Sequence, residues 1–484
     1  MKLLQLFGTL PEARIPKELS AREVSVISHR ADTVFRGGMY IALRGTKQDG
    51  NAYIPQAVQN GAGCIVTDAG REISADVPVI RVPDARRALS HIWSAYYGDP
   101  ANGMDMIAVT GTNGKTSTVY LLQAILREAG RRAEKITTVN GSMTTPDPEE
   151  LFRRLRAAKD AGCDTVVMEA SSHALYYEKL HPIHFGSAVF TNLTPEHLDF
   201  HGTMEAYLQA KSRLFDQCDK AYFNYDDPHG STLYEAAPCE RYYYSAKETA
   251  CDYHASHIRE YGANGVKYHL FAADRIVRIS SPMTGRFAVY NTLAAASCAM
   301  GMGIEPITVS CAVAEMRGVP GRMERVPLDG ADFAVFIDFA HTPDALEKLL
   351  GSVRAWLGEG QRLVVLFGCG GDRDPTKRPV MGEIAARLAD VTVITSDNSR
   401  TEDPEAIIRQ ILSGVPSASG VTVIPDRRSA ITHCMENARA GDVILLCGKG
   451  HEDYEITSHG KSPFCERDIV QQCFNERQTG QKEF

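Results

Sequence analysis

The stretch from Met106 to Ser117 limits the possible folds of this chain more than any other. It reads Met-Ile-Ala-Val-Thr-Gly-Thr-Asn-Gly-Lys-Thr-Ser, which is a short apolar run, a glycine turn and a Lys-Thr pair. Apolar residues then recur from Val119 to Leu126 at the spacing of one helix face, and Gly130 is a stop signal. The pattern predicts a buried strand, a tight turn and a helix.

A strand, a glycine turn and a helix in this order are typical of a phosphate-binding loop. The glycines let backbone N–H groups approach phosphates, and the helix N-terminus favours negative charge. Lys115 would neutralise the β- and γ-phosphates, and the Thr116 hydroxyl would hold Mg²⁺. The alternative is a strand, turn and helix with an incidental lysine. We therefore expect a nucleotide site, ATP or GTP, formed by Gly111, Thr112, Asn113, Gly114, Lys115, Thr116 and Ser117.

Length and composition indicate an ordinary soluble protein. The chain has 484 residues, which suggests about three domains. Its net charge of −8 offers no basic field, so we expect no nucleic-acid partner. No apolar stretch is long enough for a membrane span, and the N-terminus does not read as a signal peptide. The twelve cysteines include no Cys-x-x-Cys pair, which predicts neither a disulfide framework nor a zinc ribbon and favours the cytoplasm.

Two Gly/Pro breaks divide the chain into three predicted α/β domains. Gly98-Asp99-Pro100 precedes the phosphate-loop strand, and Pro320-Gly321-Arg322 precedes a third segment. The domains are therefore expected at residues 1–102, 103–320 and 321–484. The first alternates short strands and helices and by itself indicates no chemistry.

The middle segment contains candidate metal ligands. A predicted strand from Thr165 to Met168 ends at Glu169, where a second Mg²⁺ ligand belongs. His197 and His201 are four residues apart, as in some zinc sites, but Pro195 and Gly202 favour a loop.

Two further residues of the middle segment lie on predicted helices. The helix from Met204 to Leu214 carries Lys211, and a lysine at such a position is most often a solvated surface charge. A later helix rich in small residues starts near Tyr290, with Asn291 as a plausible N-cap.

The third segment reads as a doubly wound domain. Four predicted strands alternate with helices, and a polar cluster follows each strand. Because the carboxyl ends of parallel strands share one edge of a sheet, the clusters predict a small-molecule site at the switch point. The strands are 334–338, 363–367, 391–395 and 443–446.

Seven ordered motifs resemble the Mur ligase family of peptidoglycan synthesis, and the likeness covers nearly the whole chain. It is greatest to the members that add the third amino acid to UDP-N-acetylmuramoyl-L-alanyl-D-glutamate, the MurE type. The motifs are 110–116, 168–175, 191–211, 320–324, 338–344, 368–374 and 448–454. The resemblance implies three domains: an N-terminal α/β domain for the UDP-sugar, a central P-loop ATPase-like domain and a C-terminal Rossmann-like domain for the amino acid.

The resemblance also implies roles for individual residues. Lys211 matches a lysine that reacts with CO₂ to become N-carbamoylated, an anionic Mg²⁺ ligand, so the surface-charge interpretation no longer holds. Glu169 and His197 match the other ligands of that second Mg²⁺, with Thr116 serving the first, and Lys115, His197 and Lys211 form the catalytic set. Other matches are nucleotide contacts at Asn291, Arg322 and Asp338, muramoyl-peptide contacts at Ser28, Thr144, Thr145 and Ser172, and amino-acid contacts at Asp397, Asn398, Arg400, Gly448 and Glu452.

The implied activity is ATP-dependent formation of an amide bond. ATP phosphorylates a carboxylate to an acyl phosphate, and an incoming amine displaces phosphate through a tetrahedral intermediate. Lys115 and two Mg²⁺ ions would neutralise the anionic partners, and domain closure would exclude water. Arg400 favours meso-diaminopimelate, because a guanidinium can grip the distal carboxylate bidentately. All partners are then small molecules, and a monomer is the expected form.

Three departures from the family pattern keep alternatives open. Ser399 replaces the proline of Asp-Asn-Pro-Arg, and the stretch before Thr144 looks short. Ser28-His29-Arg30 stands near where the family carries Asp-Ser-Arg, but its register to Met39 does not fit that pattern. One alternative is therefore a Mur-like ligase acting on another acyl substrate, such as a folate or a specialised peptide. Another is an ATP-binding switch or structural protein, against which Lys211 with Glu169 and His197 argues.

Overall fold

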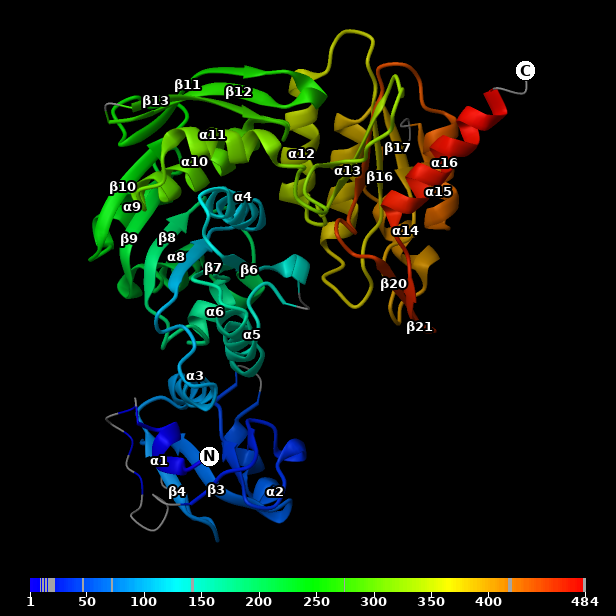
Figure 1. Ribbon diagram of the computed structural model, residues 1–484. Helices are drawn as coiled ribbons and strands as arrows, with labels where there is room; N and C mark the ends of the chain where they lie inside the picture. Colours follow the sequence, from blue (N-terminus) through cyan, green and yellow to red (C-terminus); the bar gives the residue numbers. More distant parts are fainter. Residues whose placement is uncertain are drawn as a thin grey trace. The chain divides into compact units, whose positions relative to one another are not determined.

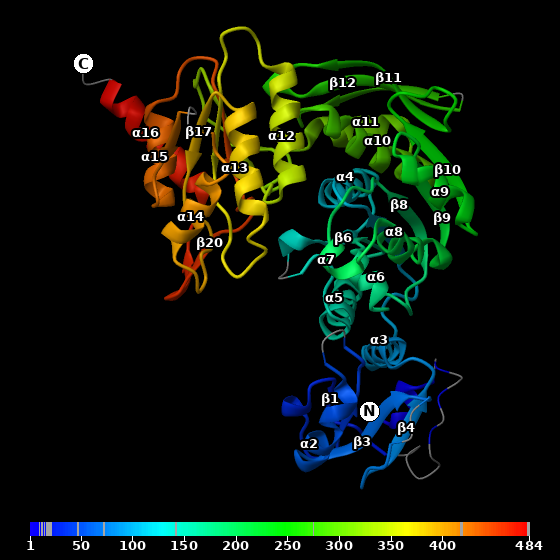
Figure 2. The ribbon, with the colours of Figure 1, turned by 180° about the vertical axis from the view of Figure 1, so that it is seen from behind.

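The computed structural model describes two compact units. The first comprises Met1–Lys115 and Leu126–Tyr244, and the second comprises Thr116–Ile125 and Ser245–Phe484. The residues described are 1–8, 10, 13, 15, 22–45, 48–70, 73–140, 143–273, 275–416 and 420–481. Figures 1 and 2 show their helices and strands from opposite sides.

The first unit begins with a small parallel sheet in the order β1-β2-β3-β4. Asp84 caps the longest helix of this part, because its carboxylate accepts hydrogen bonds from the backbone N–H groups of Arg86 and Arg87. The elements confirm the expected alternation of short strands and helices. They are α1 (Leu3–Leu6), β1 (Ile27–Ser28), β2 (Gly38–Ile41), α2 (Ile54–Gln59), β3 (Ala62–Asp68), β4 (Val79–Val82), α3 (Ala85–Tyr96) and the 3₁₀ turns Ala31–Thr33 and Gly50–Tyr53.

A second sheet of the first unit carries the phosphate loop. Six of its nine strands are parallel, in the order β10-β9-β8-β5-β7-β6. All residues of β7 are buried, as in a parallel sheet covered on both faces. The strands are β5 (Asp105–Thr110), β6 (Ala133–Ile136), β7 (Thr165–Glu169), β8 (Phe185–Phe190), β9 (Cys218–Asn224) and β10 (Glu240–Ser245).

The helices that follow these strands include one that was not expected. The segment from Thr194 to Gly202 was predicted as a loop, but Leu198–His201 form the short helix α7, which starts after His197 in a left-handed conformation. The others are α5 (Pro148–Asp160), α6 (Ser172–Tyr176), α8 (Met204–Ser212), α9 (Pro228–Ala236), the 3₁₀ turns Thr138–Asn140 and Phe215–Gln217, and α4 (Lys115–Glu128), of which Thr116–Ile125 belong to the second unit.

The second unit opens with three antiparallel strands, β11 (Tyr253–Glu260), β12 (Val266–Ala272) and β13 (Arg275–Ser281), and the 3₁₀ turn Gly262–Asn264. Helices α10 (Arg286–Gly301) and α11 (Pro306–Glu315) follow. The prediction that Asn291 caps α10 is wrong. Gly285, with a φ of 82°, sets the start of the helix, so Asn291 lies inside it and is buried.

The rest of the second unit is the predicted doubly wound domain. Its sheet has the order β14-β15-β19-β16-β17-β18, and only β14 runs antiparallel. The elements are β14 (Glu324–Arg325), β15 (Ala334–Asp338), α12 (Pro343–Trp356), β16 (Leu363–Phe367), α13 (Lys377–Leu388), β17 (Val391–Ile394), α14 (Pro404–Leu412), β18 (Val421–Val423), α15 (Arg427–Glu436), β19 (Val443–Cys447), β20 (Tyr454–Thr457), β21 (Gly460–Pro463) and α16 (Glu466–Gln481).

Alternate residues of the central strands enter two separate cores. Leu363, Val365 and Phe367 pack with α12, α13 and α14, whereas Val364 and Leu366 pack with α15 and α16. The two helical layers lie on opposite faces of the sheet (Figures 1 and 2). This arrangement leaves the carboxyl ends of β15, β16, β17 and β19 free for polar loops. None of the helices described could cross a membrane, because none is both long and apolar enough.

Candidate active site

The phosphate loop occupies the turn between β5 and α4, as predicted. Gly111 has a φ of 147°, and a Cβ there would lie 1.9 Å from Thr191 Oγ1, so only glycine fits. Asn113 is held by Asn192, whose side chain accepts from the Asn113 N–H at 2.9 Å and donates to the Asn113 carbonyl at 3.1 Å. The loop is therefore shaped before any ligand enters.

The ammonium of Lys115 folds back over this loop. Its Nζ donates to the carbonyl oxygens of Gly111 and Thr112 at 3.0 and 2.7 Å. Gly114 has a φ of 86°, a left-handed conformation suited to glycine, which turns the chain directly into α4. Thr116 and Ser117 continue the first turn of that helix, with Thr116 buried.

Lys211 is buried beneath the same loop instead of lying at the surface. Only 1% of the residue is exposed, and its Nζ donates to the carbonyl of Gly111 at 2.8 Å. The Nζ also lies 4.6 Å from the ring centre of Tyr207. Burial first, and then the positive charge of Lys115, hold the pKa of Lys211 well below its ordinary value. A buried lysine of this kind can be a neutral, nucleophilic amine.

Glu169 ends β7 and is 1% exposed. One carboxylate oxygen accepts from the backbone N–H of Thr138 at 3.0 Å, and the Thr138 hydroxyl lies 3.4 Å from both oxygens. The same hydroxyl donates to Thr144 Oγ1 at 3.1 Å, and Thr145 Oγ1 donates to the Glu169 carbonyl at 2.8 Å. The structure therefore groups three residues that the sequence singled out separately, and it adds Thr138.

Histidines gather around Ser172, another predicted substrate contact. His201 Nε2 and Ser172 Oγ share a hydrogen bond of 3.0 Å, and the ring of His173 lies 4.8 Å from that of His197. Burial lowers the pKa of His173 and of His201 to about 4. Burial also lowers the pKa of His197, and the charges of Lys115 and Lys211 lower it further, although Glu196 opposes them. These rings are therefore neutral at pH 7 and can act as ligands or hydrogen-bond acceptors.

A zinc site has no support among the residues described, since no group of three or more His, Cys, Asp or Glu side chains could hold a metal there.

Ser28, predicted to contact the substrate, closes a turn in the small sheet. Its Oγ donates to the Arg30 carbonyl at 3.0 Å and shares a 2.7 Å hydrogen bond with Thr33 Oγ1.

In the second unit, Asp338 and Arg322 stand side by side in the folded chain. The Asp338 carboxylate accepts from the N–H groups of Met323 and Ala340 at 2.7 and 2.8 Å, and burial raises its pKa. The Arg322 guanidinium lies 4.8 Å from the ring centre of Phe339, and its buried Nε has no hydrogen-bond partner among the residues that the structure describes. An aromatic ring, a carboxylate and a guanidinium with spare donors can together hold a polar, anionic ligand.

The loops after β17 and β19 meet through Asn398, Lys449 and Glu452. The fully buried Lys449 donates to Asn398 Oδ1 at 3.0 Å and to the Tyr454 carbonyl at 2.9 Å. Lys449 therefore orients the Asn398 amide, whose Nδ2 donates to Glu452 Oε2 at 2.7 Å. Burial raises the pKa of Glu452.

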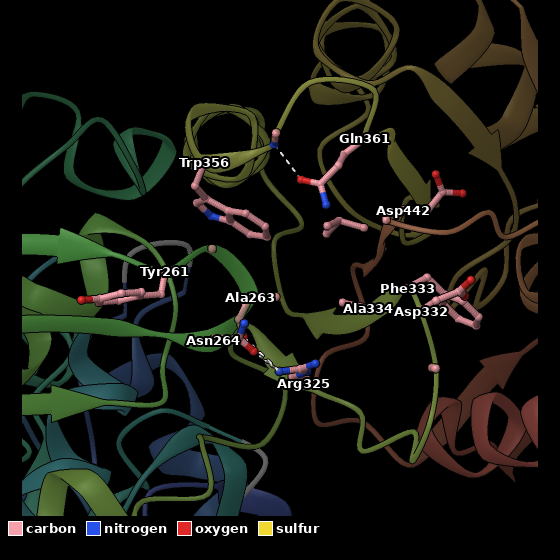
Figure 3. Close-up of a pocket in the computed structure, with 15 residues that line it drawn as sticks. Tyr261, Ala263, Asn264, Arg325, Asp332, Phe333, Ala334, Trp356, Gln361 and Asp442 are labelled. Carbon is pink, nitrogen blue, oxygen red and sulfur yellow. Dashed lines mark hydrogen bonds between the residues drawn. The ribbon is translucent and has the colours of Figure 1, made fainter.

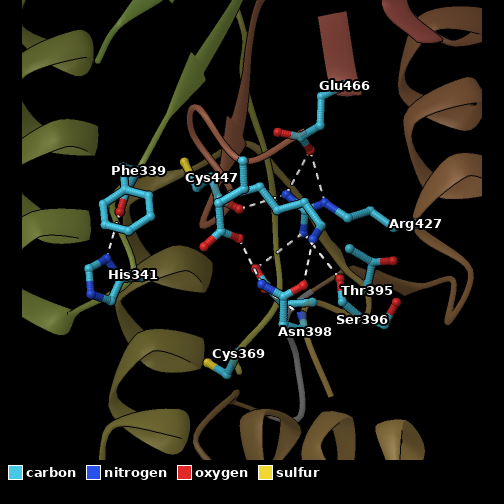
Figure 4. Close-up of polar contacts among 12 residues, drawn as sticks. Phe339, His341, Cys369, Thr395, Ser396, Asn398, Arg427, Cys447 and Glu466 are labelled. Atoms are coloured by element: carbon cyan, nitrogen blue, oxygen red, sulfur yellow. Dashed lines mark hydrogen bonds and ion pairs between the residues drawn. The ribbon is translucent and has the colours of Figure 1, made fainter. Parts of the chain in front are cut away.

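A buried ion pair braces these loops from behind. Arg427 donates to Glu466 at 2.9 Å and also to the carbonyls of Ser396 and Cys447, at 3.1 and 2.8 Å (Figure 4). Burial opposes ionisation of Asp397, but the charges of Arg427 and Lys449 hold the pKa of Asp397 below its usual value. No local pattern predicted a role for Arg427 or Glu466, because each lies on a helix far along the chain from the loops it supports.

Arg400 and Gly448 complete the set predicted to bind the amino acid. Arg400 adopts a left-handed φ of 52°, and its Nη1 donates to the Gly371 carbonyl at 2.8 Å and the Asn398 carbonyl at 3.3 Å. Gly448 has a φ of 109°, and a Cβ there would lie 2.6 Å from Asp397 Oδ2. Asp397, Asn398, Arg400, Gly448 and Glu452 therefore form one connected cluster.

A hollow of about 400 Å³ lies at the amino ends of strands β15 and β19, at the edge of their sheet opposite the predicted amino-acid site (Figure 3). Its lining includes Ala334 and Val443, the first residues of β15 and β19, together with Trp356 and Gln361. The predicted residues instead lie at the carboxyl ends of the strands, so this hollow is not the predicted amino-acid site.

Comparisons with known proteins identify the family of this chain. The family models described as "Mur ligase family, catalytic domain", "Mur ligase middle domain" and "Mur ligase, glutamate ligase domain" match residues 23–97, 109–299 and 321–450. Together they cover most of the chain.

Relatives whose likeness covers nearly all of this chain carry the name UDP-N-acetylmuramoyl-L-alanyl-D-glutamate--2,6-diaminopimelate ligase. One from Syntrophomonas wolfei is 39% identical over 97% of this chain and 98% of its own, and one from Gloeobacter violaceus is 40% identical over 94% and 95%. A solved structure of an enzyme with the same name has a TM-score of 0.70 at 30% identity and covers 98% of this chain and 99% of its own. The chain belongs to the Mur ligase family.

Proposed function

We propose that this protein adds meso-diaminopimelate to UDP-N-acetylmuramoyl-L-alanyl-D-glutamate, in an ATP-dependent step of peptidoglycan precursor synthesis. The observation that carries the proposal is the buried Lys211, held 2.8 Å from the carbonyl of Gly111 in the phosphate loop. A buried amine at a phosphate loop serves the chemistry of an acyl phosphate, whereas a nucleotide-dependent switch or a structural protein has no need of it.

The phosphate loop positions ATP for attack by the terminal carboxylate of the muramoyl dipeptide. The ammonium of Lys115 donates hydrogen bonds to two carbonyls of the loop. When ATP enters, this ammonium turns toward the β- and γ-phosphates. The resulting acyl phosphate is attacked by the amine of the incoming amino acid, and phosphate leaves. Asn291, Arg322 and Asp338 contact the nucleotide, whereas Ser28, Thr144, Thr145 and Ser172 contact the muramoyl dipeptide.

The donor set suits Mg²⁺ under one condition. Glu169 offers a buried carboxylate and His197 a neutral ring, but Lys211 in its ammonium form would repel a cation. Carbamoylation by CO₂ converts this group to an anion with oxygen donors, which are the atoms Mg²⁺ prefers. Thr116 would hold the first Mg²⁺, and Glu169, His197 and carbamoylated Lys211 the second. When bound, the ions stabilise the charge that develops on the transferring phosphoryl group.

The cluster after β17 and β19 holds the amino acid. Arg400 offers a guanidinium for the distal carboxylate of diaminopimelate, and Glu452 and Asp397 offer carboxylates for ammonium groups. Gly448 leaves room at this point, since a side chain would collide with Asp397. Asn398, fixed by Lys449, keeps Glu452 in place.

The domain boundaries belong to the same proposal, with residues 1–102 binding the UDP-sugar, 103–320 binding ATP and 321–484 binding the amino acid. We also propose that the enzyme works as a monomer in the cytoplasm, where its precursor substrates are made.

A Mur-like ligase acting on a different acyl substrate is the second candidate. The departures at Ser28-His29-Arg30 and before Thr144 motivate it, because both would fall on the nucleotide-sugar side. The relative from Syntrophomonas wolfei argues for the first candidate, since its likeness spans 97% of this chain, including this region.

Phosphate release by the purified protein tests the proposal. The reaction contains UDP-N-acetylmuramoyl-L-alanyl-D-glutamate, ATP, Mg²⁺ and either meso-diaminopimelate or L-lysine. We expect turnover with meso-diaminopimelate and little with lysine. Turnover only when a different carboxylate substrate replaces the muramoyl dipeptide as the acyl donor would favour the second candidate, and preference for lysine would contradict the role of Arg400.

A further inference from the structure

Two cysteine side chains meet in the first unit, far from the phosphate loop. The Sγ atoms of Cys218 and Cys239 lie 3.6 Å apart, although 21 residues separate them along the chain. Cys218 is the first residue of β9, and Cys239 immediately precedes β10. These strands are parallel neighbours, seen side by side in Figure 1, so sheet pairing holds both thiols in place.

The two thiols differ in exposure. Cys218 is 7% exposed and belongs to the hydrophobic core, whereas Cys239 is only partly buried at the edge of that core. The hydrogen bond donated by Cys218 lowers the pKa of Cys239, and Arg241 also favours its thiolate, although burial opposes both. Cys239 can therefore react with a small oxidant from solvent, whereas the buried Cys218 is shielded from solvent and lies next to Cys239.

We propose that Cys218 and Cys239 are a paired oxidation site that closes to an intramolecular disulfide when the protein meets hydrogen peroxide. The sulfur atoms need to approach by about 1.5 Å to reach bonding distance. The site is independent of the ligase function, because Cys218 lies at the amino end of β9, the phosphate loop follows the carboxyl end of β5, and β5, β8 and β9 run parallel.

The chemistry balances with peroxide as the oxidant. The Cys239 thiolate attacks one peroxide oxygen, so an S–O bond forms, the O–O bond breaks, and the released hydroxide takes a proton to become water. The Cys218 thiol then attacks the sulfenic sulfur of Cys239, so an S–S bond forms and the S–O bond breaks, and the leaving hydroxide takes the thiol proton to become a second water. Two electrons pass from the sulfur atoms to peroxide, and a dithiol reductant reverses the change.

Peptide mapping of the full-length protein tests this proposal. The protein is treated with stoichiometric peroxide, denatured, alkylated and digested. We expect a peptide in which Cys218 is joined to Cys239, a loss of two alkylatable thiols, and recovery of both after dithiothreitol. Alkylation of both cysteines after peroxide treatment, or oxidation of Cys239 to sulfinic acid without a bridge, would overturn the proposal.

Serine variants identify the order of events. In Cys218→Ser the sulfenic acid of Cys239 should persist and react with dimedone, whereas in Cys239→Ser the buried Cys218 should stay reduced. Cys251→Ser is the matched control, because Cys251 is also partly buried, and it should form the bridge like the wild type. Equal dimedone labelling of Cys239 in the wild type and in Cys218→Ser would contradict a resolving role for Cys218.

Discussion

Replacing Lys211 by methionine should separate the chemical role of this residue from any structural one. The side chain is buried, and a charge-assisted hydrogen bond such as that to Gly111 contributes about 1.5–3 kcal/mol. Desolvation of a buried ammonium costs several kcal/mol, so the two terms offset each other. A neutral methionine of similar length should therefore leave the free energy of unfolding within about 1 kcal/mol of the wild type or raise it.

Turnover should respond very differently. If Lys211 is carbamoylated, Lys211→Met removes an anionic ligand from a metal that stabilises the transition state by several kcal/mol. A loss of about 4 kcal/mol corresponds to a rate lower by about 10³-fold. Phosphate release at saturating ATP, muramoyl dipeptide and meso-diaminopimelate measures this rate, and thermal unfolding measures stability. Lys159→Met, which changes a half-buried lysine of α5 that donates to the Asn102 carbonyl, is the control and should match the wild type in both.

Arginine at the same position distinguishes a carbamate from a simple buried cation. Lys211→Arg keeps the positive charge but cannot form the carbamate, so it should be as inactive as Lys211→Met. Wild-type protein in ¹³C-labelled bicarbonate should also show a carbamate carbon resonance that both variants lack. Wild-type turnover in Lys211→Arg, or a loss of more than about 3 kcal/mol of stability in Lys211→Met, would refute this reasoning.

Two further changes test other parts of the site, and a third tests an ion pair of the second unit. Arg400→Met should raise the KM for meso-diaminopimelate by about 10–100-fold, the worth of a bidentate carboxylate contact, while the KM for ATP stays constant in the same phosphate-release assay; equal changes in both would argue against a specific contact. Gly111→Ala should abolish detectable ADP binding in calorimetry, because the new Cβ would collide with Thr191 Oγ1; wild-type affinity would show that the loop can rearrange. Glu402 accepts two 2.8 Å hydrogen bonds from Arg378, which lower its pKa to about 2, so it contributes stability above its unfolded pKa that is lost as the pH falls from about 4.5 to 2. Glu402→Gln should therefore lower stability by about 1–2 kcal/mol at pH 6 but not near pH 2, and chemical unfolding with an equal deficit at both pH values would contradict the assignment.

Local patterns in the sequence predicted most of the strands that carry the site. The run before Gly111 predicted β5, and the spacing after Lys115 predicted α4, because both signals lie within a few residues of each other. The same holds for β15, β16, β17 and β19, whose continuous apolar runs are typical of buried parallel strands. The predicted start of α10 was wrong because the prediction relied on Asn291 as a capping side chain. The helix begins instead after Gly285, a glycine in a left-handed conformation.

By itself the sequence determined the order of strands, glycine turns and polar clusters, and with it the nature of the chain as an α/β ligase with a phosphate loop. Only the tertiary structure decided which side chains are buried together. It placed Lys211 under Gly111, fixed Asn398 with Lys449, and braced the loops after β17 and β19 with Arg427 and Glu466. The physical reason is distance along the chain: burial and charge pairing join residues 39 to 100 positions apart, and no local spacing records them.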